Sequence, residues 1–228
     1  MNKNGNAFQR LKRAVVGIIG RERANQITNP YYDRQARRET QEFLASLPKG
    51  DLFLNLGCGT RPMKGWVNID RARGPEVQVV WDLADKLPFA DSTCAGIFSE
   101  HVIEHLTRDA AAELLSECCR VLRPGGVLRI STPDAERFLL SYAGDGEFLK
   151  HPNFGAPAES RLDRINQMMR EYGQHLWVYD AESLTRLLRA AGFGSVTRQE
   201  FGKSVHPRMQ DIDTPEREFE SLYLEGIK

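Results

Sequence analysis

The stretch LFLNLGCGT, from Leu52 to Thr60, decides the fold of this chain. An apolar run, Asp51–Leu56, stops at Gly57, and Gly59 follows two residues later. A short apolar run bounded by glycine is typical of a buried parallel strand. Glycine also lets the backbone approach a ligand closely and adopt dihedral angles that other residues avoid. We therefore expect a central strand that ends in a turn at a ligand site.

Strands and helices alternate through the rest of the chain. Runs of apolar residues predict further strands over residues 66–70, 77–82, 95–99, 127–131, 196–201 and 219–227. Apolar residues at helical spacing predict helices over residues 35–47, 110–122, 161–172 and 181–191. Because strands that alternate with helices form mostly parallel sheets with both faces covered, an α/β fold is expected.

Two long connections interrupt this alternation. Residues 134–180 are longer than most loops in a compact domain, which is typical of a lid or a substrate-shaping insert. Residues 202–217 precede the last strand and are expected to hang over the active site, with a solvated loop as the alternative. The polar residues that this loop carries are His206, Arg208, Asp211, Asp213 and Arg217.

Residues 1–50 are expected to form an N-terminal helical segment that packs on a main domain of residues 51–228. Within this segment, residues 8–19 place apolar side chains at helical spacing and basic side chains on the other faces. The alternative role for this basic amphipathic helix is docking on an anionic membrane surface or on a partner protein.

Composition narrows the function classes. The 228 residues include 31 Lys plus Arg and 31 Asp plus Glu, so the formal net charge is zero and no nucleic-acid partner is expected. No membrane-spanning run or signal-peptide core is recognisable, which favours a cytoplasmic location. The four cysteines lack C-x-x-C spacing, so reduced thiols are expected. A monomer or a homodimer is expected.

The glycine turn is followed by two acids at predicted strand ends. In an open parallel sheet, ligands bind beyond the carboxyl ends of the strands. There, Asp70 can accept both hydroxyls of a ribose, and Asp82 lies one strand further out, where an adenine edge fits. A dinucleotide site requires a third glycine and an acid about 20 residues on. This chain has Thr60, Arg61 and Pro62 after Gly59, which argues against NAD.

Four segments resemble the class I S-adenosylmethionine-dependent methyltransferases. They are LNLGCGT, GWVNID, LPFADSTCAGIFSEHVIEHL and RVLRPGGVLRISTPD, and a looser match continues through HLWVYDAESLTRLLRAAGF and ESLYLEGIK. The resemblance implies a doubly wound, seven-stranded, mostly parallel sheet of the Rossmann-like methyltransferase type, with the last strand antiparallel. Within the superfamily, the chain is most similar to small bacterial methyltransferases of surface-polysaccharide and other glycan pathways.

The resemblance also implies S-adenosyl-L-methionine as the cofactor. It places Asp70 on the ribose, and Gly57, Cys58 and Gly59 at the methionine part. It also places Asp82 and Leu83 near the adenine, and Ser99 and Glu100 beneath the cofactor. A simple tight turn is the alternative for the glycines, and helix capping is the alternative for Asp82. Asn55 stands where many members carry an acid, so it can orient the loop without supplying charge.

The segment HVIEH, from His101 to His105, matches the H-x-x-E-H of inverted zinc proteases. Such a site requires a long helix and a distant third ligand, whereas this segment leaves a predicted strand, so no metal is expected. Methyl transfer to a hydroxyl benefits from removal of the proton, for which histidine is suited. His101 is the first choice of base, His105 is the second, and Glu104 orients either ring. The alternative is a buried polar cluster that shapes the pocket.

A third candidate group lies in HLWVYD, which the resemblance places beside the acceptor pocket. His175, Tyr179 and Asp180 are therefore expected substrate contacts, with a helix cap at Asp180 and a surface location for His175 as the alternative. The expected function is methyl transfer from S-adenosylmethionine to an oxygen of a sugar, glycan precursor or related small molecule. The alternatives are a catalytically silent S-adenosylmethionine-binding partner protein, or methylation of a quinone, lipid or amine.

Overall fold

The computed structural model describes residues 30–48, 50–155 and 157–228, and the chain divides into two compact units, residues 1–45 and 46–228. Helix α3 (Pro30–Ser46) is the described element of the first unit, and it covers the predicted helix over residues 35–47 except for its last residue. Its exposed face carries pairs four residues apart, such as Arg38 with Glu42 at 2.8 Å. The predicted basic helix over residues 8–19 lies outside the described residues.

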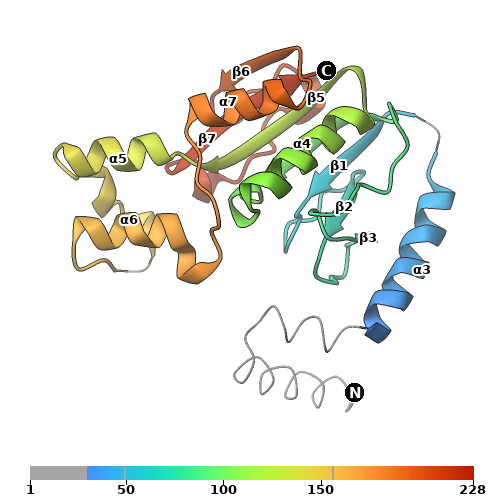
Figure 1. Ribbon diagram of the computed structural model, residues 1–228, viewed down its shortest axis with the longest axis horizontal. Coiled ribbons are helices and arrows are strands. Elements are labelled where there is room, and N and C mark those ends of the chain that lie inside the picture. The colour runs from blue at the N-terminus through green and yellow to red at the C-terminus, as the bar shows by residue number, and fades with distance from the viewer. Residues whose placement is uncertain (1–29, 49, 156) are drawn as a thin grey trace. The chain divides into compact units, whose positions relative to one another are not determined.

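The second unit is built on one seven-stranded sheet with the strand order β3-β2-β1-β4-β5-β7-β6 (Figure 1). Its strands are β1 (Leu52–Leu56), β2 (Val67–Asp70), β3 (Val79–Val80), β4 (Cys94–Glu100), β5 (Leu122–Pro133), β6 (Ser195–Gln199) and β7 (Ser221–Ile227). β1 to β5 pair in parallel, whereas β7 is antiparallel to both β5 and β6. The predicted α/β fold with an antiparallel last strand is confirmed.

Two helices pack on one face of the sheet, where Figure 1 shows them side by side. Helix α4 (Arg108–Val121) begins at Thr107, whose hydroxyl accepts from the amide of Ala110. Helix α7 (Ala181–Ala190) begins at Asp180. Their buried residues include Leu114, Leu115, Cys118, Leu184 and Leu188, which supply the apolar stripe that an amphipathic helix turns toward a core.

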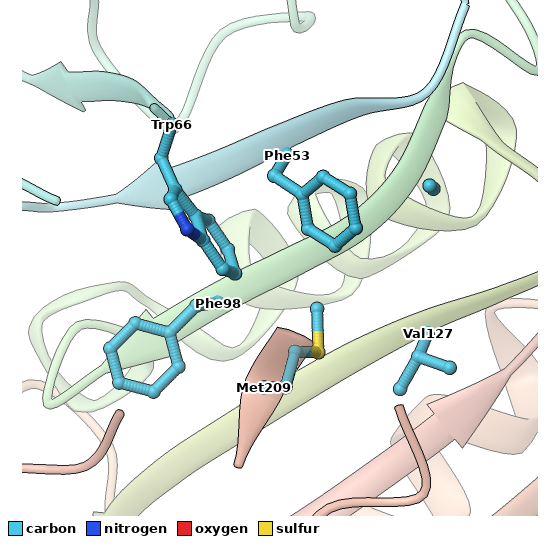
Figure 2. Packing of buried hydrophobic residues seen from close by; sticks show 6 residues of the cluster. Phe53, Trp66, Phe98, Val127 and Met209 are labelled. Atoms are coloured by element: carbon cyan, nitrogen blue, oxygen red, sulfur yellow. The ribbon is translucent and has the colours of Figure 1, made fainter. Parts of the chain in front are cut away.

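The loop between β6 and β7 packs on the other face of the sheet. Met209, from the 3₁₀ helix η5 (Pro207–Met209), is fully buried against Phe53, Trp66 and Phe98 (Figure 2). A Cβ atom added to Gly96 of β4 would lie 2.3 Å from the Met209 methyl carbon, so glycine is required at this close approach. The loop therefore contributes a core residue to the domain.

A buried arginine holds this loop in place. Arg129 of β5 is fully buried, its Nε donates to Asp213 Oδ1 at 2.7 Å, and it lies 3.3 Å from Glu225 Oε1. The same guanidinium donates to the backbone carbonyls of Glu200 and Lys203. Burial lowers the pKa of Arg129, but the bonds and charges of the two acids outweigh it and raise the pKa above its ordinary value.

These contacts correct the expected position of the β6–β7 loop. His206 and Arg208 lie against Phe53 on the sheet face, and Asp213 is buried beneath Arg129. These three residues do not lie over the carboxyl ends of the strands as predicted. The packing of Met209 and the hydrogen bonds of Arg129 hold the loop against the sheet face instead. Only the returning part of the loop, which includes Arg217 in η6 (Pro215–Arg217), reaches the predicted active site.

The insert of residues 134–180 contains more helix than predicted. Helix α5 (Ala135–Ala143) was not expected, and Asp134 caps it by accepting from the amide of Arg137. The insert continues through η2 (Phe148–Lys150), η3 (Pro152–Phe154), α6 (Arg161–Arg170) and η4 (Glu171–Gly173). Ala135, Phe138, Leu149, Ile165 and Met168 form its own small core, beyond the end of β5 (Figure 1). None of the helices in the described ranges combines the length and apolarity needed to cross a membrane.

Candidate active site

The glycine turn and the acid of β2 form one hydrogen-bonded unit. Gly57 and Gly59 have φ values of +64° and +50°, in the left-handed region that favours glycine. The amide of Cys58 donates to the carbonyl of Ile69 at 3.0 Å, and the amide of Gly59 donates to Asp70 Oδ2 at 2.8 Å. The turn that follows β1 is thus fixed against the carboxyl end of β2, as the sequence predicted.

Two buried asparagines support this turn from below. Asn55 Nδ2 donates to the carbonyl of Arg61 at 3.1 Å and to Asn68 Oδ1 at 3.0 Å. Asn68 in turn accepts from the amide of Met63 at 2.7 Å and donates to the carbonyl of the same residue. Asn55 therefore orients the loop without a charge, which agrees with its expected role.

The geometry at Asp70 fits an adenosyl group. Its Oδ1 accepts from the amide of Ala72 at 2.7 Å, and its Oδ2 accepts from Gly59. A carboxylate offers about four lone-pair positions, so roughly two remain for the two hydroxyls of a ribose. Further out, Leu83 is buried and Asp82 is exposed, with Oδ1 of Asp82 accepting from the amide of Ala84 at 3.1 Å.

The end of β4 connects the cofactor side to the rest of the site. Ser99 is buried, and Glu100 Oε1 accepts from the amide of Thr214 at 2.9 Å, while Oε2 accepts from the hydroxyl of the same residue. Val102 lies so close to the glycine turn that a Cβ atom on Gly57 would be 2.3 Å from its Cγ2. Glu100 is thus engaged with the returning β6–β7 loop, and its predicted contact with the cofactor stays a prediction.

His101 is held by three polar neighbours. Its Nε2 lies 2.7 Å from Ser221 Oγ, and its Nδ1 lies 2.9 Å from an Arg217 nitrogen and 3.2 Å from Glu104 Oε1. The Ser221 hydroxyl donates to the carbonyl of Arg217, so it accepts from Nε2–H of His101. In the neutral ring, the lone pair is therefore on Nδ1 and accepts from Arg217, whereas in the protonated ring Nδ1–H can donate to Glu104 Oε1. The left-handed backbone of His101, with φ of +52°, turns the chain out of β4 at this point.

Glu104 is a fully buried carboxylate next to this ring. Its Oε2 accepts from the hydroxyl of Thr132 at 3.1 Å, and its main-chain carbonyl accepts from the amides of Leu176 and Trp177. Burial raises the pKa of Glu104, but the hydrogen bond and charge of His101, together with a backbone hydrogen bond and the charge of His105, outweigh this effect and hold the pKa below its ordinary value. Glu104 is therefore ionised near neutral pH, and its backbone ties the 175–177 segment to the end of β4.

His105 and His175 meet although they are 70 positions apart in sequence. His105 Nδ1 lies 3.1 Å from the carbonyl of Gln174, and the two imidazole rings pack edge to face with centroids 4.9 Å apart. The side chain of His175 is buried rather than on the surface. The H-x-x-E-H segment is not an α-helix, because it turns at His101 and continues as the short η1 (Ile103–His105).

A cavity of about 360 Å³ lies beside His101, under the insert. Aromatic and charged side chains line it together, among them Phe138, Phe154, Phe219, His175, Glu171 and Arg217. Among the described residues, Tyr179 and Asp180 are not part of this lining. Asp180 Oδ1 instead accepts from the amide of Ser183 at 2.8 Å and caps α7. Tyr179 is buried, which together with the charge of Glu104 raises its pKa to about 12.

Several residues of this site were missed by sequence reasoning. Ser221 and Glu171 contact His101 and His175 respectively, and Glu220 and Arg164 line the cavity. No local motif marks them, because each is brought in by the insert or by the start of the antiparallel strand. Their only sequence signal is polarity within the long connection or just before a predicted strand.

The sheet order, the glycine turn and the Asp70 anchor define the class: a Rossmann-like, nucleoside-binding methyltransferase domain. Residues 29–197 match the family model described as "Methyltransferase domain", and the chain belongs to this family. The curated and solved proteins that resemble the chain agree with this assignment.

Two curated relatives are similar over part of the chain. A probable S-adenosylmethionine-dependent methyltransferase from Mycolicibacterium smegmatis is 43% identical over 68 residues, which are 30% of this chain and 26% of that protein. The ubiquinone/menaquinone biosynthesis C-methyltransferase UbiE from Desulfotalea psychrophila is 31% identical over 127 residues, which are 53% of this chain and 49% of that protein. The chain thus spans about a quarter to a half of these relatives.

A solved structure of an S-adenosylmethionine-dependent methyltransferase from Thermotoga maritima shares the fold. It superposes with a TM-score of 0.51 over 85% of this chain and 89% of that protein, at 21% sequence identity. Neither this protein nor the two curated relatives is named for a glycan pathway.

Proposed function

We propose that this chain transfers a methyl group from S-adenosylmethionine to an oxygen of a small hydroxyl-bearing acceptor, such as a sugar or a glycan precursor. One observation carries the proposal: the residues that follow β4 contact both the glycine turn and the cavity. Val102 packs on the glycine turn, while the preceding His101 lines the cavity. A donor at Gly57–Gly59 and an acceptor in the cavity would therefore meet at this segment.

In this proposal the chain's cofactor residues act by binding and orientation. Asp70 holds the ribose, and the Gly57–Gly59 turn with Cys58 lies along the methionine part. Asp82 and Leu83 lie near the adenine, with Ser99 and Glu100 beneath. S-adenosylmethionine supplies an electrophilic methyl group, so the main tasks of the protein are alignment and exclusion of water.

The lining of the acceptor cavity suits a ring-shaped, polar molecule. The ring of Phe154 packs on those of Phe138 and Phe219, with centroids 5.4 and 4.9 Å apart. Charged groups such as Arg217 and Glu171 line the same space and provide hydrogen-bond donors and acceptors. His175 is the predicted acceptor residue that this geometry supports, and the roles of Tyr179 and Asp180 as acceptor contacts stay predictions.

His101 is the proposed general base. Its Nδ1 carries the lone pair and would take the proton of the acceptor hydroxyl once Arg217 yields this position to the acceptor. The ionised Glu104, 3.2 Å away, would then stabilise the imidazolium that forms. His105 remains the second choice, because its Nδ1 faces a carbonyl and its Nε2 is left as the basic nitrogen.

Two measurements test this function. Calorimetry with S-adenosylhomocysteine should show binding by the wild type and a more than tenfold loss for Asp70→Ala, since charge-assisted hydrogen bonds are lost. Unchanged affinity in this variant would contradict the assignment of Asp70 to the ribose. Labelled S-adenosylmethionine with cell-envelope extract should then give a labelled glycan.

The identity of the labelled product decides among the acceptors. Mass spectrometry that places the methyl group on a sugar oxygen supports the proposal. A labelled quinone, lipid or amine would identify that compound, in place of a sugar, as the acceptor. The quinone is the first alternative because the UbiE relative is named for ubiquinone/menaquinone biosynthesis. Cofactor binding without any labelled product would instead favour a catalytically silent binding protein.

A further inference from the structure

One carboxylate and two imidazoles converge at the rim of the acceptor cavity. One ligand atom from each of Glu104, His105 and His175 lies within 4.8 Å of the other two. We propose that these three side chains form a binding site for one divalent first-row transition-metal ion. This inference goes beyond the proposed methyl transfer and departs from the expectation that the H-x-x-E-H segment holds no metal.

The hydrogen bonds of the two histidines favour metal binding. His105 Nδ1 faces the carbonyl of Gln174, and His175 Nδ1 faces the carbonyl of Met168. A carbonyl oxygen only accepts, so each Nδ1 carries the proton and each neutral ring has its lone pair on Nε2. Metal-binding histidines almost always donate their other nitrogen to such a partner, which fixes the ring orientation. Both rings are therefore prepared to bind through Nε2.

Glu171 lies beside the cluster and contacts one of its members, His175. Its Oε2 lies 2.7 Å from His175 Nε2, although Nδ1 of that ring already donates to a carbonyl. A lone pair on Nε2 would face a carboxylate oxygen, so the pair requires a proton or a cation between its members.

The backbone around Glu171 is held in an unusual conformation. Glu171 and Tyr172 are consecutive non-glycine residues with φ values of +33° and +55°. Such residues cost on the order of 1–3 kcal/mol each and cluster at functional sites. This kink ends α6 and brings the Glu171 carboxylate back toward His175, so the strain serves the convergence of the cluster.

The charge and the rigidity of the cluster suit a divalent ion. Glu104 is a fully buried carboxylate, and the partly exposed carboxylate of Glu171 contacts His175 beside it. The main-chain carbonyl of Glu104 accepts from Leu176 and Trp177, which fixes the distance between the two ligand segments. Two nitrogen ligands favour zinc, copper, nickel or iron over magnesium and calcium, which prefer oxygen. His175 and Glu171 also line the cavity, so open coordination positions would face the acceptor.

Metal uptake by untagged, chelator-treated protein tests the site without donor or acceptor. Titration calorimetry with Zn²⁺ should show one ion per chain, and Co²⁺ should give a visible absorption band from nitrogen ligation. His105→Asn and His175→Asn are the matched ligand variants, because the Asn amide can keep the donor near the Nδ1 position while Nε2 is removed. Each should weaken Zn²⁺ affinity by about 100-fold or more.

His206→Asn is the matched control, since it changes a histidine that lies against Phe53 on the sheet face. It should bind Zn²⁺ as the wild type does. S-adenosylhomocysteine affinity should stay unchanged in all three variants, which separates this site from the proposed function. Equal Zn²⁺ affinity in the wild type and both ligand variants, or no uptake at millimolar Zn²⁺, would overturn the proposal.

Discussion

The two halves of the carboxyl edge of the sheet are built in different ways. At the ends of β1 and β2, the contacts join residues close in sequence, from Asn55 to Asp70, through backbone amides and short side chains. At the ends of β4 and β5 and the start of β7, the contacts join distant parts of the chain. His101 contacts Ser221 and Arg217, and His105 contacts Gln174. The bonds of the glycine turn itself are local, although Arg61 and Gly65 beyond it contact Glu216 and Arg208. The second half is assembled by tertiary folding.

In the proposed function, this difference separates the general task of cofactor binding from the specific task of acceptor binding. The cofactor half needs only a tight turn and one anchored acid, because a nucleoside presents the same ribose and backbone-sized groups in every reaction. The acceptor half takes its polar groups from the insert and from the β6–β7 loop, so its shape can change with those segments while the turn stays the same. Substitutions should therefore affect the two halves separately.

The largest expected effect is a loss of stability at the β6–β7 loop, which contributes residues to the acceptor half. Asp213→Ala leaves Arg129 as a buried cation without its closest partner, which costs about 3–5 kcal/mol of the free energy of unfolding. Urea unfolding measures this loss. Glu182→Ala is the matched control, because its ion pair with Arg186 is exposed and is worth about 0–1 kcal/mol.

The same variant sharpens the comparison of the two halves. Thr214 and Arg217 follow Asp213, so their contacts with Glu100 and His101 should loosen, and turnover should fall. Affinity for S-adenosylhomocysteine, measured on the folded fraction, should change little because the glycine turn has no direct bond to this loop among its described contacts. Equal losses of cofactor affinity and turnover would show that the halves are one unit.

The second prediction concerns the proposed base. His101→Ala should lower turnover by about 10²–10⁴-fold, because the acceptor hydroxyl loses the group that takes its proton. Affinity for S-adenosylhomocysteine should remain near the wild-type value, and His206→Ala should retain turnover. Normal turnover of His101→Ala, measured with labelled S-adenosylmethionine, would exclude His101 as the base.

The third prediction targets the point where the halves touch. Gly57→Ala puts a Cβ atom 2.3 Å from Val102 Cγ2 at a φ of +64°, so the turn or the end of β4 must move. Cofactor affinity should fall by about tenfold or more, as expected for strain of 1–3 kcal/mol. Gly59→Ala should cost less, since no atom lies closer than 4.0 Å to the added carbon.

A double substitution tests the cause of that loss. Val102→Ala removes the methyl group that the new side chain would meet, so Gly57→Ala with Val102→Ala should recover part of the affinity lost by Gly57→Ala alone. Calorimetry with S-adenosylhomocysteine measures all four proteins. The absence of recovery would assign the loss to backbone strain at Gly57 rather than to contact with Val102.

The sequence predicted the strands, their parallel arrangement and the glycine turn beside Asp70, because period, glycine and strand-end acids are local signals. It could not predict that Met209 and Arg129 draw the β6–β7 loop onto the sheet, since this depends on a contact across 84 positions between Arg129 and Asp213. Helix α5 was missed although Asp134 gives a capping signal. The contact between His175 and His105 likewise could not be predicted from the sequence of either segment alone.

The smallest expected effect concerns Asp180, which was predicted to contact the acceptor. Its carboxylate caps α7, so Asp180→Ala should reduce the free energy of unfolding by about 1 kcal/mol, while Asp180→Asn keeps most of the cap. If Asp180 is only a cap, the KM for the acceptor stays unchanged in both variants. A raised KM with normal stability would restore its predicted place in the acceptor half.

The pH dependence of this loss gives an independent check. The side-chain hydrogen bond from Ser183, followed by the bond from its amide, holds the pKa of Asp180 below the ordinary 3.8. A lowered folded-state pKa stabilises the native protein fully above about pH 3.8, and this contribution is lost as the pH falls through the lower folded value. The stability difference between wild type and Asp180→Ala, measured by urea unfolding, should therefore be constant from pH 7 to pH 5 and shrink toward pH 3. A difference that does not shrink would mean that the cap does not depend on the charge of Asp180.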